Sequence, residues 1–220
     1  MSNSVDINVH HVTRVEGHGN IRVRASDGTI EQVEWQVPEA PRFFEAMVRG
    51  RDFQDIQTIV SRICGICSVT HSLAALKAVE AAIGADVSDQ TDKLRILAHC
   101  GEQLESHSLH LGYLVAPDLL GTNSVVPLVD SHPDIVKTII RIHKLGNDWM
   151  ELIGGRRTHP VSFRVGGFGK LPSKHDLRYL KQRLENIIPD LQTVAGVILD
   201  LAPKLPDFTR DTEYISLIDP

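Results

Sequence analysis

The sequence has few cysteines and no long apolar run, and these absences exclude several common classes of protein. Only three of its 220 residues are cysteine, and this small, odd number argues against a disulfide-stapled extracellular domain. We therefore expect a reducing compartment, the cytoplasm. No apolar run approaches the roughly 18 to 20 residues of a membrane-spanning helix, and the N-terminal residues lack the apolar stretch of a secretion signal. We expect no direct membrane span.

Basic residues are too few and too scattered to indicate a nucleic-acid-binding protein. The chain has 23 lysines and arginines against 28 aspartates and glutamates, which gives a formal net charge of −5. Its hydrophobic share of 42% and charged share of 23% are typical of an ordinary globular protein. This length is enough for one large or two small domains, and we expect no nucleic acid among the partners.

The first forty residues read as a β region. INVHHV is short and rich in β-branched residues, and NIRVRASDGTIEQVEWQV alternates apolar and polar residues on both sides of Asp27-Gly28. An Asp-Gly pair between two alternating runs is a strong hairpin signal. We therefore predict a β-hairpin region over residues 1–40.

From Pro41 onward the apolar residues recur at helical spacing, so we predict a helical body over residues 41–220. One helix is expected to end or break near Gly146, another to tolerate Pro189, and a short strand flanked by loops is expected within 154–172. The predicted helices cover residues 41–50, 52–63, 68–83, 89–115, 133–155 and 173–202. The predicted fold class is α+β, with a small N-terminal antiparallel β region packed on a predominantly helical body.

The stretch VSRICGICSVTH, residues 60–71, carries two of the three cysteines. Cys64 and Cys67 are three residues apart at a turn that leads into a helix, so both sulfurs point to one side and form half of a tetrahedral thiolate site. Arg62 and the start of the helix near Ser68 favour thiolates, because positive charge stabilises them. His71 follows one helical turn later, where its imidazole could donate to a sulfur.

Four interpretations of this pair compete. A thioredoxin-like dithiol lacks its βαβ context, and a zinc ribbon lacks a second cysteine pair or histidine pair at suitable spacing. In the third interpretation both cysteines are buried and have no chemical role. We make the same assignment, an inert core residue, for the remaining cysteine, Cys100. We favour the fourth, in which Cys64 and Cys67 contribute two thiolates to a larger transition-metal centre.

RICGIC with the following His71 resembles the first cysteine motif of the nickel-iron hydrogenase large subunit. TRVEGHGNI (13–21), PRFFEAMVRGRD (41–52) and LGNDWMELIGGRRTHPVSFRVGGF (145–168) also resemble blocks of that family, in its order. The similarity runs from residue 8 to about residue 180, and it is closest to the soluble cytoplasmic branch of bidirectional and sulfhydrogenase-type enzymes. The sequence is therefore identified as similar to the N-terminal half of such a subunit.

The resemblance implies roles for five residues. Cys64 would be a terminal nickel ligand, and Cys67 would bridge nickel and an iron that carries diatomic ligands. Glu16 would be the first proton acceptor beside the nickel, and these three residues would form the catalytic set. Arg62 and His71 would lie just outside the metal ligands and support them. The alternative for Glu16 is an ordinary salt bridge to a nearby arginine, Arg14 or Arg22.

Further roles follow from the same resemblance. Glu45 would hold a buried magnesium or iron ion, and its alternative is a surface carboxylate on a helix. His159 would lie near the closest iron-sulfur cluster of a partner small subunit, with loop packing as its alternative. His107 and His110 could share a helix face as metal ligands by spacing alone, although helical histidines more often pack or face water.

The family's second cysteine motif does not occur in this sequence. No cysteine follows Cys100, so the chain offers two of the four thiolates that the centre needs. We expect an incomplete large-subunit domain whose partners are an iron-sulfur small subunit of hydrogenase and diaphorase-type electron-transfer subunits. The alternative is a non-catalytic homologue, such as a structural subunit related to the quinone-side subunit of respiratory complex I.

Overall fold

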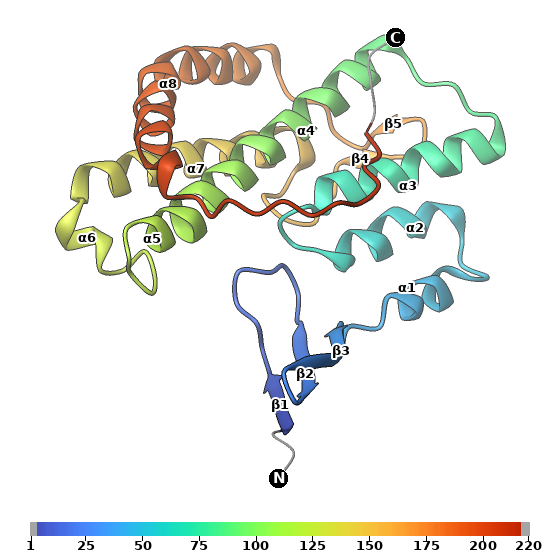
Figure 1. The fold of residues 1–220 in the computed structure, drawn as a ribbon. Helices are drawn as coiled ribbons and strands as arrows, with labels where there is room; N and C mark the ends of the chain where they lie inside the picture. The colour runs from blue at the N-terminus through green and yellow to red at the C-terminus, as the bar shows by residue number, and fades with distance from the viewer. Residues whose placement is uncertain (1–3, 217–220) are drawn as a thin grey trace. The chain divides into compact units, whose positions relative to one another are not determined.

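A computed structural model describes residues 4–216 of the chain (Figure 1). The chain divides into two compact units. One comprises Met1–Gln103 with Gly146–Leu177, and the other comprises Leu104–Leu145 with Arg178–Pro220. In the described part of the chain, no helix is both long and apolar enough to cross a membrane.

A three-stranded antiparallel sheet opens the chain. Its strands are β1 (Ser4–Val9), β2 (Asn20–Ser26) and β3 (Thr29–Gln36), in the order β1-β2-β3. Asp27 and Gly28 both have positive φ, as a tight two-residue hairpin turn requires, so the predicted hairpin is confirmed. The register places apolar side chains on one face, where Ile7 is paired with Val23 and Val23 with Val33.

The cysteine pair lies among the first helices of the chain. They are α1 (Pro41–Val48), α2 (Phe53–Val60), the short 3₁₀ helix η1 (Ser61–Ile63) and α3 (Ser68–Ile83), followed by α4 (Asp89–Leu109). Asp52 caps α2, because its side chain accepts a hydrogen bond of 2.9 Å from the Gln54 N–H. Helix α3 has the predicted bounds, and Gly84 ends it in a left-handed conformation.

The rest of the chain is also largely helical. The π-helix η2 (His110–Val115) directly follows α4, so the predicted run over 89–115 changes its helical pitch at His110. In place of the single short strand that we predicted, residues 163–168 form a hairpin of two strands of two residues each. The remaining elements are α5 (Ala116–Leu119), α6 (Leu128–Ser131), α7 (Pro133–Gly154), β4 (Phe163–Arg164), β5 (Gly167–Phe168), α8 (Lys174–Leu201) and the 3₁₀ helix η3 (Ala202–Lys204).

The predicted end or break near Gly146 is wrong, because α7 continues without interruption to Gly154. A glycine inside a helix costs only about 1 kcal/mol relative to alanine. Just after Gly146, α7 buries Trp149, Met150 and Ile153, and this burial outweighs that cost. Helix α8 continues through Pro189, as predicted.

A buried ion pair joins α3 to α4 in the first unit. The Nη1 and Nη2 atoms of Arg95 donate to the two carboxylate oxygens of Glu80, each at 2.7 Å, with the two side chains only 3% and 6% exposed. The pKa of Glu80 is lowered chiefly by the hydrogen bonds from Arg95. Arg95 also donates to the Arg164 carbonyl, and the Gly166 N–H donates to Glu80, so the same pair holds the β4-β5 turn.

Candidate metal centre

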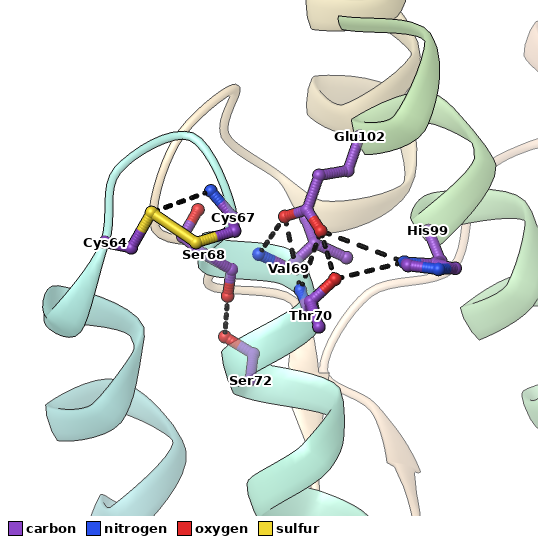
Figure 2. Close-up of polar contacts among 8 residues, drawn as sticks. All are labelled: Cys64, Cys67, Ser68, Val69, Thr70, Ser72, His99 and Glu102. Carbon is purple, nitrogen blue, oxygen red and sulfur yellow. Dashed lines mark hydrogen bonds and ion pairs between the residues drawn. A yellow bond between two sulfur atoms is a disulfide. The ribbon is translucent and has the colours of Figure 1, made fainter. Parts of the chain in front are cut away.

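Cys64 and Cys67 lie in the loop between η1 and α3. Cys64 is extended, and Cys67 takes the N-cap position of α3, the last residue before the helix. Their Cα atoms are 5.5 Å apart, and the Cys67 N–H points at the Cys64 sulfur, 3.2 Å away. The two sulfurs are joined in a disulfide, which is the oxidised form of the pair (Figure 2). Reduction would free two adjacent thiolates on one side of the loop.

His71 is brought to the pair by the first turn of α3. Its N–H donates to the Cys67 carbonyl at 3.1 Å, and its ring nitrogen and the two sulfurs all lie within 4.8 Å of one another. The three residues are partly buried. Among the described residues this is the one cluster of three histidine, cysteine or acidic side chains that could hold a metal ion.

Glu16 approaches the pair from the segment between β1 and β2. Its Oε1 atom lies 3.6 Å from the Cys64 sulfur, although the two residues are 48 positions apart in the sequence. Of the two arginines named as alternative partners of Glu16, Arg14 and Arg22, Arg22 pairs with Asp6 at 3.2 Å. Glu16 is exposed, so its carboxylate contacts both the sulfur and water.

His159 holds both ends of the cysteine loop. Its Nδ1 lies 2.8 Å from the Ser61 carbonyl oxygen, and its main-chain N–H donates to Ser68 Oγ at 2.9 Å. Ser61 precedes the two cysteines and Ser68 follows them. The neighbouring Thr158 lies within van der Waals distance of where a Cβ on Gly65 would be, so the 156–160 loop runs along the cysteine loop. His159 itself has φ +56°, a conformation uncommon for a side chain larger than glycine.

Glu102 reaches the start of α3 from α4, and its carboxylate is almost fully buried. It accepts hydrogen bonds from the main-chain N–H groups of Val69, at 2.6 Å, and Thr70, at 3.1 Å. The Thr70 hydroxyl also donates to it and lies 3.1 Å from His99 Nδ1 (Figure 2). A carboxylate at this end of a helix is stabilised by the unpaired N–H groups and the helix dipole.

The other predicted residues lie apart from this cluster. Arg62 is exposed on η1, beside the loop in sequence. Glu45 is 64% exposed on α1 and faces Arg42 across 3.8 Å, so any buried ion there would need ligands from outside the described residues. His107 and His110 are both exposed. Cys100 is exposed, and our assignment of it to the core is wrong, because it lies on the outer side of α4.

Sequence reasoning missed Glu102, Ser61 and Ser68. One signal for Glu102 was present: it follows Leu94 and Ala98 at four-residue intervals, so it lies on the apolar face of α4. A charged residue on such a face is rarely buried without a partner. The partners themselves, Val69 and Thr70, could not be read from the sequence.

The side chains of Cys64, Cys67 and His71 could bind one side of a soft transition metal. Two thiolates and an imidazole suit nickel, zinc or iron, and hard oxygen ligands are absent from this cluster of described residues. A four-coordinate thiolate site would need further sulfurs, and the one other cysteine, Cys100, is not in the cluster. The residues therefore fit one half of a nickel-iron centre.

The chain is similar to known hydrogenase subunits over most of its length. Residues 42–139 match the family model described as nickel-dependent hydrogenase, and residues 6–40 match one described as HoxL-like. The chain is 37% identical to the alpha subunit of sulfhydrogenase 2 from Pyrococcus furiosus, over 87% of this chain and 46% of that protein. It is 31% identical to the beta subunit of the NAD-reducing hydrogenase HoxS from Cupriavidus necator, over 71% of this chain and 35% of that protein.

A solved structure also has the same fold. A crystal structure of an NAD+-reducing [NiFe]-hydrogenase superposes with a TM-score of 0.84 at 31% identity, over 92% of this chain and 47% of that chain. The chain belongs to the nickel-dependent hydrogenase family, as a large-subunit sequence whose relatives include the sulfhydrogenase and NAD-reducing types. It spans about half the length of the sulfhydrogenase relatives that it matches.

Proposed function

We propose that this chain supplies the first pair of thiolates to the nickel-iron centre of a hydrogenase that catalyses reversible oxidation of H2. The observation that carries the proposal is the meeting of Cys64, Cys67 and His71 within 4.8 Å, with the Glu16 carboxylate 3.6 Å from the Cys64 sulfur. This cluster lies in a chain whose family and fold are those of hydrogenase large subunits.

Each of the residues Cys64, Cys67, Glu16, Arg62 and His71 has a defined task in this proposal. A nickel-iron centre with diatomic ligands on its iron would supply, when bound, the Lewis acidity for heterolytic cleavage of H2. Cys64 would be a ligand of the nickel, and Cys67 would be a ligand of both nickel and iron. Glu16 takes a proton at its Oε1 atom from the Cys64 sulfur and, being exposed, passes it to water. Arg62 and His71 support the thiolates through charge and hydrogen bonding.

The electrons would leave through a partner. With three cysteines in all, the chain cannot hold its cysteine pair and a four-cysteine iron-sulfur cluster as well. We propose an iron-sulfur small subunit, with His159 facing its nearest cluster, and diaphorase-type subunits beyond it. We also propose a magnesium or iron ion at Glu45, completed by ligands outside the described residues, and a cytoplasmic location.

Nickel content and H2-dependent dye reduction test the proposal. The two further thiolates come from outside this sequence, so the purified chain alone should show no turnover. The complete enzyme should carry nickel and reduce the dye, and Cys67→Ser should abolish both. Retained turnover in the Cys67→Ser enzyme, or stoichiometric nickel with turnover in the chain alone, would sink the proposal.

A further inference from the structure

The cysteine motif leaves the first N–H groups of helix α3 without a hydrogen-bond acceptor at the N-cap. The first N–H groups of a helix have no partner inside the helix, and a serine, threonine, aspartate or asparagine at the N-cap usually accepts one of them. Here the N-cap is Cys67, and its side chain makes no capping hydrogen bond. A sulfur that binds a metal at that position does not accept hydrogen bonds from the helix N–H groups. Another part of the chain must therefore supply the acceptor.

Glu102 provides that cap from α4. Its carboxylate binds the N–H groups of Val69 and Thr70, the second and third residues of α3, and the Thr70 hydroxyl as well. With only 1% of the residue exposed, this carboxylate has little contact with water. Burial of a charged carboxylate is unfavourable unless hydrogen bonds compensate it, and these three donors do so.

Helix α4 is held close enough for this contact by its own packing. A Cβ on Gly101 would lie 3.0 Å from Trp149 Cγ and 3.3 Å from the Met150 main-chain nitrogen, so α7 approaches α4 closely beside Glu102. The Thr70 hydroxyl in turn lies between the Glu102 carboxylate and His99 Nδ1. The carboxylate is therefore fixed both by its helix and by its partners.

These contacts fix the backbone that follows the second cysteine. Val69 and Thr70 are two and three residues after Cys67, and the His71 N–H closes the first helical turn on the Cys67 carbonyl. On the other side of the loop, His159 holds Ser61 and Ser68. We propose that Glu102 is a positioning residue of the metal site, which acts through the first turn of α3 to aim the Cys67 sulfur. This inference rests on the proposed function of the pair.

Cobalt binding by the full chain tests the inference without an activity assay. The reduced chain is titrated anaerobically with Co²⁺, and the sulfur-to-cobalt charge-transfer band gives the affinity while the visible ligand-field bands report the geometry. Loss of a residue that orients metal ligands typically costs about 10- to 100-fold in affinity, so we expect Glu102→Ala to lose that much and to shift the ligand-field bands. Glu102→Gln should lose less, because its amide oxygen still accepts hydrogen bonds.

Leu76→Ala is the matched control, because it removes a buried side chain from the same helix without touching its first turn. It should melt at a lower temperature than wild type and still bind Co²⁺ with wild-type affinity and bands at temperatures where it is folded. If Glu102→Ala does not fold, Glu102→Gln decides the question in the same titration. Wild-type affinity and bands in the folded Glu102 variants would overturn the inference alone. Failure of the wild-type chain to bind Co²⁺ would overturn the thiolate role of the pair and the inference with it.

Discussion

The Nδ1 atom of His159 lies 2.8 Å from the carbonyl oxygen of Ser61, 98 residues earlier in the chain. The same residue donates its main-chain N–H to Ser68 Oγ. Since Ser61 and Ser68 stand on either side of Cys64 and Cys67, one histidine spans the base of the cysteine loop. These two contacts give His159 the loop-packing role that the sequence left as its alternative.

Replacement of His159 by alanine should loosen the loop and weaken metal retention. The main-chain bond to Ser68 can persist, but the side-chain contact with Ser61 is lost. We expect the affinity for nickel to fall by about 10-fold, at the lower end of what outer-shell changes cause, so that the complete enzyme loses nickel on dialysis against a chelator. Metal analysis measures this. His175→Ala, an exposed histidine on α8, is the control and should retain wild-type nickel.

Replacement of Glu16 by glutamine should slow proton transfer without removing metal. Glutamine keeps the shape of the side chain near Cys64 but cannot accept a proton, and general acid–base catalysis typically contributes about 10²- to 10⁴-fold. We expect H2-dependent dye reduction by the complete enzyme to fall within that range at unchanged nickel content. Glu31→Gln, an exposed carboxylate in β3, should have no effect. An active Glu16→Gln enzyme would exclude Glu16 from the proton path.

Replacement of Arg95 by methionine should destabilise the first unit strongly. It leaves the Glu80 carboxylate buried without its cation, a change that typically costs about 3 to 5 kcal/mol. Urea unfolding followed by circular dichroism measures the free energy of unfolding. Lys93→Met on the exposed side of α4 should stay within about 0.5 kcal/mol of wild type.

The ion pair of Arg95 and Glu80 also predicts how the stability of the chain depends on pH. The pKa of Glu80 is lowered in the folded chain by Arg95, so the pair contributes its full stability above the ordinary glutamate pKa of about 4.3. That contribution is lost as the pH falls from this value through the lowered pKa of the folded state. Unfolding of wild type and Arg95→Met should therefore differ most at neutral pH and converge under acid. A constant difference down to pH 2 would contradict the assignment.

Gly112 in the π-helix η2 should not tolerate a side chain. A Cβ there would lie near Ile139 Cγ2 and 3.0 Å from Ile139 Cδ1, so Gly112→Ala should cost about 1 to 3 kcal/mol through overpacking. Gly196→Ala in α8 is the contrasting control, because a Cβ there meets nothing within 4 Å. That change should stabilise the chain by up to about 1 kcal/mol, since alanine favours a helix over glycine. Thermal unfolding of both variants measures the difference.

Features set by neighbouring residues were predictable from the sequence. The positive φ values of Asp27 and Gly28 follow from their residue types, and α3 ends at Gly84 because glycine adopts the left-handed conformation easily. The meeting of Cys64, Cys67 and His71 was likewise predictable from their spacing along the start of α3. The predicted break at Gly146 failed because burial along α7 outweighs a local preference of about 1 kcal/mol.

The sequence by itself determined which residues offer metal ligands and where the helix that follows the two cysteines begins. Only the tertiary structure decided what holds them in place, because Glu102 meets Val69 across 33 residues and His159 meets Ser61 across 98. Such contacts depend on which faces become buried together, and periodicity along the chain does not encode that pairing. Cys67 is a poor cap for α3 by its chemistry, and it was the fold that placed a buried carboxylate where the cap was missing.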